Sequence, residues 1–235
     1  MELGHEYRWT VANVQTETPR IKNIYLESCS ERPVFIAGQY LTVKLPDCSP
    51  AEGKAYSISS APTESQVRLS IKRIGVFSEA LLSLQSGDEL ITTAPYGFFY
   101  PEPEESSPLV FVVGGIGITP CLSIIKDLAY QQNSRPVQLH YSNQTESDIA
   151  FFAELEQLTA QHPNLSVMHY VTREQPANDA VTFGRMTIKS LLSHVDLSTD
   201  AEFFICGSMD FTKTLWKGLH GAGVPQHQLY TEGFF

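Results

Sequence analysis

The sequence is poor in cysteine and lacks the spacings by which cysteines hold metals. No two of its four cysteines form a CxxC pair; they are Cys29, Cys48, Cys121 and Cys206. Zinc sites and four-cysteine iron–sulfur clusters need closely spaced thiolates. The 7 histidines are equally scattered, so no metal site is expected.

Long apolar runs and an excess of positive charge are also missing. No stretch approaches the ~20 apolar residues that span a bilayer. The opening segment MELGHEYRWT has neither the basic flank nor the apolar run of a signal peptide. With 16 Lys and Arg against 26 Asp and Glu, the net charge is −10, which disfavours binding to nucleic acid or anionic lipid. We therefore expect a cytoplasmic protein with no nucleic-acid partner and no membrane insertion.

The first hundred residues are typical of a small β-barrel. Short β-rich runs with alternating apolar positions are separated by clusters of Gly, Pro, Asp and Ser. The runs cover residues 11–15, 21–26, 40–45, 55–59, 67–73 and 89–93. One helix is expected over residues 78–84. This pattern predicts an antiparallel barrel.

The pattern changes after a stretch rich in proline and glutamate at residues 101–108. Apolar runs at 109–113, 137–141, 165–171, 203–206 and 228–231 then alternate with amphipathic helical patterns. Such alternation predicts a five-stranded parallel sheet with helices on both faces. We therefore expect two domains, an antiparallel β-barrel over residues 1–103 and an α/β domain over residues 104–235.

A glycine-rich loop follows the first parallel strand and opens its helix. It contains Gly114, Gly115 and Gly117, followed by Thr119 and Pro120. Glycine lets the backbone approach a phosphate, and a helix N-terminus offers free N–H groups to it. Pro120 fits the first helical turn, where its missing N–H costs nothing. A tight turn needed only for packing could have a similar sequence. The position of this loop between a strand and a helix favours a dinucleotide-binding site.

Two barrel segments carry further candidates. Lys54-Ala55-Tyr56-Ser57 lies on the fourth strand, and by itself it is typical of a strand with one inward aromatic. The segment from Lys72 to Ser78 leads into the short helix. Its backbone N–H groups form a second candidate anion site.

In their order along the chain these motifs resemble the ferredoxin–NADP reductase superfamily. The Lys54–Ser57 strand, Gly75-x-x-Ser78 and the glycine loop are followed by Cys206-Gly207 and, at the end, by Glu232-x-Phe234. The resemblance spans nearly the whole chain. It implies a flavin-binding barrel, an NAD(P)-binding second domain and an NAD(P)H-dependent flavin oxidoreductase. The implied flavin is FAD, with FMN as the alternative.

The resemblance also implies roles for single residues. Tyr56 would pack on the flavin, Ser57 would bond near its N5, Cys206 would lie by the nicotinamide and Glu232 would border the transfer site. Ser57, Cys206 and Glu232 are therefore the candidate catalytic residues. Relatives usually have Arg in place of Lys54, so the grip on the flavin phosphate is expected to be weaker. The complete set of implied binding residues is Lys54, Ala55, Tyr56, Ser57, Lys72, Gly75, Val76, Phe77, Ser78, Gly114, Gly115, Gly117, Thr119, Pro120, Thr172, Arg173, Arg185, Cys206, Gly207 and Phe235.

Two of these expectations concern the coenzyme. Thr172-Arg173 resembles the Ser-Arg pair that meets the 2′-phosphate in plant-type ferredoxin–NADP reductases, and Arg185 follows close by. Because a guanidinium suits a phosphate, NADPH is favoured over NADH. Phe235 is expected to cover the flavin face that the nicotinamide must occupy.

Three functions stay open on the sequence alone. The favoured one passes electrons to a separate protein, a ferredoxin or flavodoxin, or to a small-molecule acceptor. An acidic ferredoxin would need a basic patch, for which the candidates are Lys22, Lys44, Lys54, Lys72 and Arg73. The alternative is a flavin reductase that uses free flavin as a substrate. A non-enzymatic regulatory module is disfavoured, because it would be expected to lose Ser57, Cys206 or Glu232.

Overall fold

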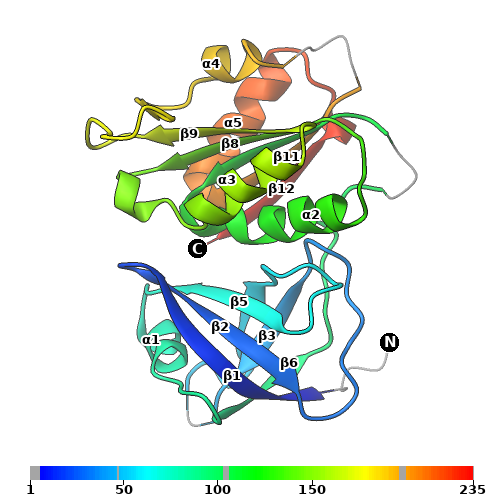
Figure 1. Ribbon diagram of the computed structural model, residues 1–235, viewed down its shortest axis with the longest axis vertical. Coiled ribbons are helices and arrows are strands. Elements are labelled where there is room, and N and C mark those ends of the chain that lie inside the picture. Colours follow the sequence, from blue (N-terminus) through cyan, green and yellow to red (C-terminus); the bar gives the residue numbers. More distant parts are fainter. Residues whose placement is uncertain (1–5, 47, 103–105, 196–199, 235) are drawn as a thin grey trace.

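Two six-stranded sheets, one from each half of the chain, form two domains that are stacked along the longest axis of the molecule (Figure 1). The computed structural model describes residues 6–46, 48–102, 106–195 and 200–234. The expected domain boundary, between residues 103 and 104, lies outside the described residues.

The first sheet is antiparallel and curls into a barrel. Its order is β4-β3-β6-β1-β2-β5, and a bridge between Ile58 and Leu69 brings the two edges together. Alternate residues such as Trp9, Val11 and Leu41 fill its interior. The elements are β1 (Glu6–Thr18), β2 (Ile21–Ser28), β3 (Tyr40–Lys44), β4 (Lys54–Ser57), β5 (Val67–Lys72), α1 (Val76–Leu82) and β6 (Glu89–Thr93).

The second sheet is parallel, with the order β10-β9-β8-β7-β11-β12. Its strands are β7 (Leu109–Gly114), β8 (Val137–Asn143), β9 (Leu165–Val171), β10 (Val181–Phe183), β11 (Glu202–Ser208) and β12 (Leu229–Phe234). Its helices are α2 (Ile118–Tyr130), α3 (Phe152–Gln161), α4 (Ile188–Leu192) and α5 (Met209–Gly221), with short 3₁₀ turns at η1 (Gly115–Gly117), η2 (Glu146–Asp148) and η3 (Gln226–Gln228). No helix within the described ranges is long and apolar enough to cross a membrane.

The sheet has one strand more than the sequence predicts. β10 has three residues, pairs only with β9, and buries only Val181. So short an edge strand leaves no run of apolar residues or clear alternation in the sequence. The other five strands lie where the sequence predicts them.

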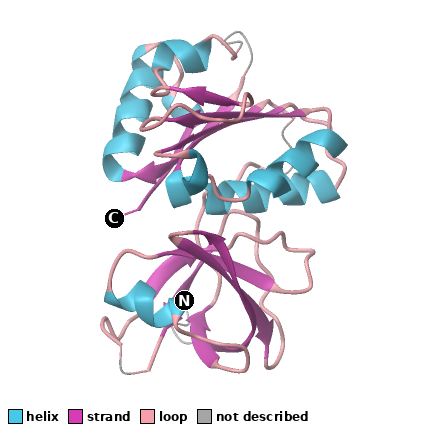
Figure 2. Cartoon of the chain, turned by 60° about the vertical axis from the view of Figure 1, so that its left-hand side comes forward, coloured by secondary structure: helices cyan, strands magenta, loops and turns pink. Residues whose placement is uncertain are grey.

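Both faces of the parallel sheet are covered, which explains the unbroken apolar run of β7. Phe111 and Val113 pack on the side of α2 and α3, whereas Val110 and Val112 pack on the side of α4 and α5. In Figures 1 and 2, helices of the second domain lie between its sheet and the barrel. The helix α2, which begins at the glycine loop, is one of them.

Buried ion pairs join the two domains beneath these helices. The guanidinium of Arg68 on β5 lies 2.9 Å from a carboxylate oxygen of Glu154 on α3. The ammonium of Lys126 on α2 lies 2.6 Å from Glu154 and 2.7 Å from Glu64 of the barrel. Charges removed from water need such partners, so the network fixes how the domains meet.

Candidate functional site

The hydroxyl of Ser57, at the end of β4, donates to the carboxylate of Glu232 on β12. The Oγ–Oε1 distance is 3.2 Å, and the bond crosses from the barrel to the second domain. Within the parallel sheet, Glu232 stands opposite Cys206 in the register of β11 and β12. The structure therefore brings together the three residues that the sequence marks as catalytic.

The carboxyl of Glu232 changes its protonation near neutral pH. Burial raises its pKa to about 7, and the hydrogen bond from Ser57 partly opposes this rise. Burial acts in this direction because it disfavours the charged form of a carboxyl. A group with such a pKa can hold or release a proton at the working pH of an enzyme.

The thiol of Cys206 is completely buried in the core under α2. Burial raises its pKa well above the ordinary value, and the charges of Cys121 and Glu232 act in the same direction. A thiol in this state is neutral and is a poor nucleophile. The side chain of Cys206 thus packs the floor of the site, and its backbone faces the glycine loop.

The three glycines of the loop meet different constraints. Gly115 has φ +55, in the left-handed region that favours glycine. A Cβ on Gly117 would lie 2.5 Å from the carbonyl oxygen of Cys206. A Cβ on Gly114 would lie 3.3 Å from the ring of Phe211, and one on Gly207 would lie 2.8 Å from it. The loop backbone therefore packs directly on the Cys206-Gly207 segment.

Thr119 and Pro120 shape the start of α2. The hydroxyl of Thr119 donates to the carbonyl oxygen of Ile116 at 3.0 Å. Both Thr119 and Pro120 are buried. They hold the first helical turn against the loop, so any ligand would meet backbone rather than these side chains.

On the barrel, Tyr56 and Lys54 surround the ring of Phe77. The rings of Tyr56 and Phe77 are stacked, with centroids 6.4 Å apart and an interplanar angle of 21°. The ammonium of Lys54 lies 6.0 Å from the Phe77 centroid. Burial raises the pKa of Tyr56 to about 12, so its phenol is neutral at physiological pH. Ala55 is exposed between them.

The turn before α1 is organised by the hydroxyl of Ser78. It accepts from the backbone N–H groups of Ile74 and Gly75 at 2.9 and 3.0 Å, and it donates to the Gly75 carbonyl at 2.7 Å. Because Ser78 closes this turn, the helix begins at Val76, two residues earlier than the sequence predicts. A Cβ on Gly75 would meet nothing within 4 Å, and Val76 is exposed while Phe77 is buried. The outer side of the turn backbone is therefore open to a ligand.

Lys72 reaches from β5 towards the second domain. Its Nζ would lie 3.9 Å from a Cβ on Gly115. This position places its positive charge beside the glycine loop. The sequence analysis includes Lys72 among the implied binding residues, and in the structure its ammonium borders both candidate anion sites.

The register of the short strand β10 brings two arginines to one end of the sheet. Val171 of β9 stands opposite Phe183 of β10, so Arg173 and Arg185 each follow this pair by two residues. Both are exposed. The hydroxyl of Thr172 instead donates to the carbonyl oxygen of Asn143 at 3.3 Å and ties β9 to β8.

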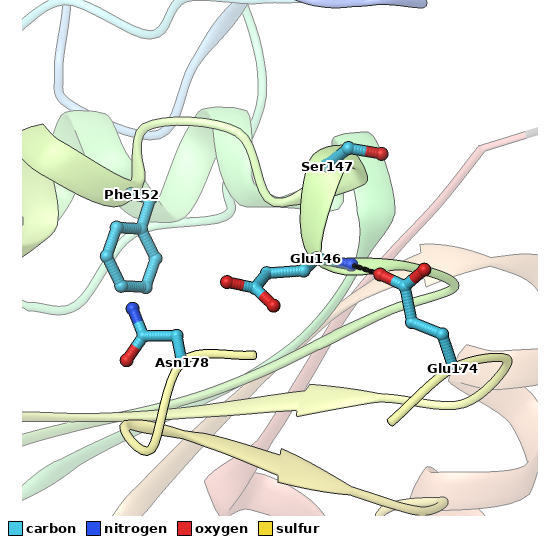
Figure 3. A pocket seen from close by; sticks show the side chains of 5 residues that line it. All are labelled: Glu146, Ser147, Phe152, Glu174 and Asn178. Carbon is cyan, nitrogen blue, oxygen red and sulfur yellow. Dashed lines mark hydrogen bonds between the residues drawn. The ribbon is translucent and has the colours of Figure 1, made fainter. Parts of the chain in front are cut away.

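A pocket of about 560 Å³ opens at the same end of the sheet; its lining residues are Glu146, Ser147, Phe152, Glu174 and Asn178. In Figure 3, the Phe152 ring, the Asn178 amide and the Glu146 carboxylate surround one hollow. Glu174 accepts from the backbone N–H of Glu146 at 2.6 Å, and Glu146 accepts from that of Ala177 at 2.8 Å. The pocket was not predicted from the sequence. Its sequence signal is a pair of acidic residues, Glu146 three positions after the end of β8 and Glu174 three positions after the end of β9.

Tyr40 is a second feature that the sequence analysis missed. It pairs with Ser57 across β3 and β4 and so stands next to the Ser57–Glu232 bond. Phe235, expected to cover the flavin, lies outside the described residues. No group of three or more His, Cys, Asp or Glu side chains that could hold a metal occurs in the part of the chain that the structure describes.

Comparison with known proteins identifies the kind of oxidoreductase. Residues 111–216 match the family described as "Oxidoreductase NAD-binding domain". The FAD/NAD-binding domain of a nitric oxide dioxygenase from Vibrio cholerae O1 biovar El Tor has 26% identity and a TM-score of 0.84, over 97% of this chain and 98% of that domain. The chain thus has the ferredoxin–NADP reductase-like fold and is an NAD(P)H-dependent flavin oxidoreductase of this kind.

Two further comparisons cover the whole ferredoxin–NADP reductase-like fold. A ferredoxin NADP⁺ reductase from Neisseria gonorrhoeae, solved with bound FAD and NADP, superposes with a TM-score of 0.86 at 23% identity, over 99% of this chain and 100% of that chain. A flavohemoprotein from Bacillus subtilis (strain 168) is 29% identical over 238 residues, which cover 97% of this chain but 59% of that protein. The chain thus spans little more than half the length of this relative.

Proposed function

We propose that the chain moves hydride from NADPH to FAD bound by the barrel and then passes electrons singly to a separate redox protein. Residues 1–103 would form the flavin domain and residues 104–235 the coenzyme domain. The observation that carries the proposal is the Ser57–Glu232 bond, which places a titrating carboxyl at the junction of these domains.

The residues of the barrel fit a flavin. When bound, a flavin accepts two electrons together and releases them one at a time. Tyr56, stacked on Phe77, offers an aromatic surface for its ring. Lys54 and Lys72 supply positive charge, and the open backbone at Gly75 and Val76 can approach phosphate oxygens. Ser78 would act by holding that backbone in place.

The residues of the second domain fit a nicotinamide coenzyme. Gly114, Gly115 and Gly117, with Gly207 behind them, expose backbone at the start of α2, where Thr119 and Pro120 fix the turn. This arrangement suits a pyrophosphate. Phe235 is proposed to cover the flavin face until the nicotinamide displaces it.

Ser57, Cys206 and Glu232 are proposed to serve the transfer site. Protonated Glu232 can hold a proton that Ser57 Oγ passes across the domain junction. The neutral thiol of Cys206 fills the space beneath and keeps water out. The protein thereby orients two rings and controls one proton, and most of the catalytic power comes from this positioning.

The preference for NADPH rests on Thr172, Arg173 and Arg185. The β9–β10 register brings both arginines to one end of the sheet, where a 2′-phosphate could pair with them. Glu146 and Glu174 oppose this preference because they add negative charge to the adjacent pocket. Each of these carboxylates accepts a backbone N–H bond, which satisfies part of its charge.

The sequence predicts a ferredoxin or flavodoxin as the acceptor. A haem protein is a second candidate, because the Bacillus subtilis relative is a flavohemoprotein of which this chain matches 59%. We propose a cytoplasmic location, which the four free cysteines support, since such thiols suit a reducing compartment.

The visible spectrum of the purified protein tests the proposal. We expect a yellow protein whose flavin absorbance is bleached by NADPH, and more slowly by NADH. A colourless protein that reduces added free flavin would instead identify a flavin reductase. A colourless protein without either activity would overturn both functions.

A further inference from the structure

An exposed apolar rim continues the Ser57–Glu232 site on the barrel. We call the side chains of Val34, Ile36, Tyr96 and Phe98 the Tyr96 rim; their exposed fractions are 95%, 47%, 52% and 70%. They account for four of the nine exposed large hydrophobic side chains in the described ranges. Apolar side chains gathered in this way mark interaction sites more often than single exposed ones do.

Hydrogen bonds to the Gln39 side chain hold the backbone of the rim in place. The side chain of Gln39 accepts from the N–H of Ile36 at 3.0 Å and donates to the Gly97 carbonyl at 3.3 Å, so it joins the two segments of the rim. Next to Phe98, the ring of Phe99 is buried against Phe204 of the second domain, with centroids 5.2 Å apart. The exposed aromatics therefore stand on an ordered backbone.

Backbone pairing connects the rim to the transfer site. Tyr40 pairs with Ser57 on one side and with Tyr96 on the other. With neighbouring strands about 4.8 Å apart, the rim begins about 10 Å from Ser57. The rings continue outward: the Tyr40 and Tyr96 centroids are 6.0 Å apart, and those of Tyr96 and Phe98 are 5.4 Å apart. The rim is thus the outer border of the site proposed for the flavin.

The two chain segments that carry the rim offer no charge for electrostatic docking. Residues 33–43 and 94–101 contain no charged side chain. Two of the candidate basic residues are already engaged elsewhere: Lys44 pairs with Glu6 at 2.8 Å, and Lys22 donates to the Leu82 carbonyl at 3.2 Å. A protein with a net charge of −10 would repel an acidic partner here.

We infer that the Tyr96 rim is the surface on which the acceptor protein docks. The acceptor is a haem protein that presents uncharged apolar side chains around its haem edge. This inference rests on the proposed function and selects the haem protein from its two acceptor classes. Each NAD(P)H oxidised to NAD(P)⁺ supplies two electrons and one proton. Two ferric haem proteins then take one electron each and become ferrous, and the proton is released to solvent.

The test compares a small acceptor with protein acceptors, using the FAD-loaded protein. Ferricyanide reports transfer to any accessible oxidant, metmyoglobin is the haem probe, and a plant-type [2Fe–2S] ferredoxin is the acidic probe. The variants are Phe98→Ser and Val34→Ser. The matched control is Tyr130→Ser, because Tyr130 is an aromatic residue exposed to 51% at the end of α2 in the other domain.

We expect Phe98→Ser to raise the KM for metmyoglobin about tenfold, as truncation of an interface anchor does, and Val34→Ser to raise it less. Ferricyanide reduction should stay within about twofold of wild type, and Tyr130→Ser should change neither rate. Raising NaCl from about 0.02 to about 0.3 M should change the metmyoglobin rate less than twofold, because no charge pair holds the complex.

Several outcomes would overturn the inference. They are unchanged metmyoglobin kinetics in both rim variants, no metmyoglobin reduction by a wild type that reduces ferricyanide, and a steeply salt-dependent preference for ferredoxin. A wild-type dimer that Phe98→Ser dissociates in analytical ultracentrifugation would show that the rim is an interface between two copies of the chain, and this would also overturn the inference.

Two further outcomes concern the enzyme itself. If Phe98→Ser and Val34→Ser lose ferricyanide and metmyoglobin reduction equally, the variants damage the protein, and the rim loses its support as a docking surface. Failure of the wild type to reduce ferricyanide would instead contradict the proposed function.

Discussion

Ser57 and Glu232 are 175 residues apart in the chain, yet their side chains meet at 3.2 Å across the junction of the two domains. Each residue alone is ordinary, a strand hydroxyl and a carboxylate near the C-terminus. The packing of the two domains buries the carboxyl of Glu232, and this burial raises its pKa to about 7, although the hydrogen bond from Ser57 partly opposes the rise. The titrating group of this site is therefore a product of domain packing.

The first prediction is that Glu232→Gln removes a pH dependence of turnover. In the wild type, the proton on Glu232 is lost as pH rises through about 7, so kcat with ferricyanide should fall above that pH. The glutamine variant should show a lower and flatter kcat over the same range. A profile whose inflection near pH 7 survives in Glu232→Gln would assign that inflection to another group.

The same substitution should change the pH dependence of stability. The folded pKa of Glu232, about 7, is higher than its ordinary value of 4.5, so the folded state holds the proton more tightly than the unfolded state. The wild type should therefore lose stability as pH rises from 4.5 to about 7, whereas Glu232→Gln should lack this contribution. Urea unfolding at several pH values measures the difference between the two slopes.

A substitution at Gly75 tests flavin binding without disturbing the fold. Its backbone is extended, with φ −170, and a Cβ there would meet nothing within 4 Å. Gly75→Val should therefore change the unfolding free energy by less than about 0.5 kcal/mol while it blocks the approach of a phosphate. We expect flavin retention after gel filtration to fall by about tenfold, a loss of about 1.4 kcal/mol.

Gly221→Val is the matched control, because Gly221 also faces open space but lies at the end of α5. It should keep its flavin. Ser78→Ala should lose both flavin and stability, by about 1 kcal/mol for each net hydrogen bond lost, since the Ser78 hydroxyl closes the turn. Full flavin retention in Gly75→Val and Ser78→Ala would show that this turn does not hold the flavin phosphate.

The sequence predicts those elements that leave a regular pattern of apolar residues along the chain. Alternating apolar residues place the barrel strands, and the unbroken apolar run of β7 indicates a strand covered on both faces. The strand β10 could not be predicted, because two of its three residues are exposed. Contacts such as Ser57–Glu232 and Arg68–Glu154 depend on how the two domains pack. The spacing of apolar residues along the chain carries no information about this packing.

Arg173 and Arg185 should set the preference for NADPH. Arg173→Ala removes a charged, forked donor, so the ratio of kcat/KM for NADPH to that for NADH should fall about tenfold. Glu174→Gln should raise the same ratio, because it removes a negative charge beside the pocket. Arg20→Ala, at an exposed position between β1 and β2, is the control and should leave the ratio unchanged. An unchanged ratio in Arg173→Ala and Arg185→Ala would contradict the NADPH preference.

The last prediction concerns Lys126, whose side chain is 5% exposed between two carboxylates. Its ammonium lies 2.7 Å from Glu64 of the barrel and 2.6 Å from Glu154 of the second domain. Replacing it with Met leaves both carboxylates in the junction without their shared cation. Breaking a fully buried pair costs about 3–5 kcal/mol. We expect about 2 kcal/mol here, because both carboxylates are partly exposed and Glu154 keeps Arg68.

Lys44→Met is the matched control, since Lys44 pairs with Glu6 at 2.8 Å on the surface of the barrel. An exposed pair contributes little, so this variant should lose less than about 1 kcal/mol in urea unfolding. Lys126→Met should also lower turnover with ferricyanide, because a looser junction would separate Ser57 from Glu232. If Lys126→Met loses no more stability than Lys44→Met and keeps full turnover, the ion pairs do not hold the domains in register, and the apolar contacts of the junction must do so.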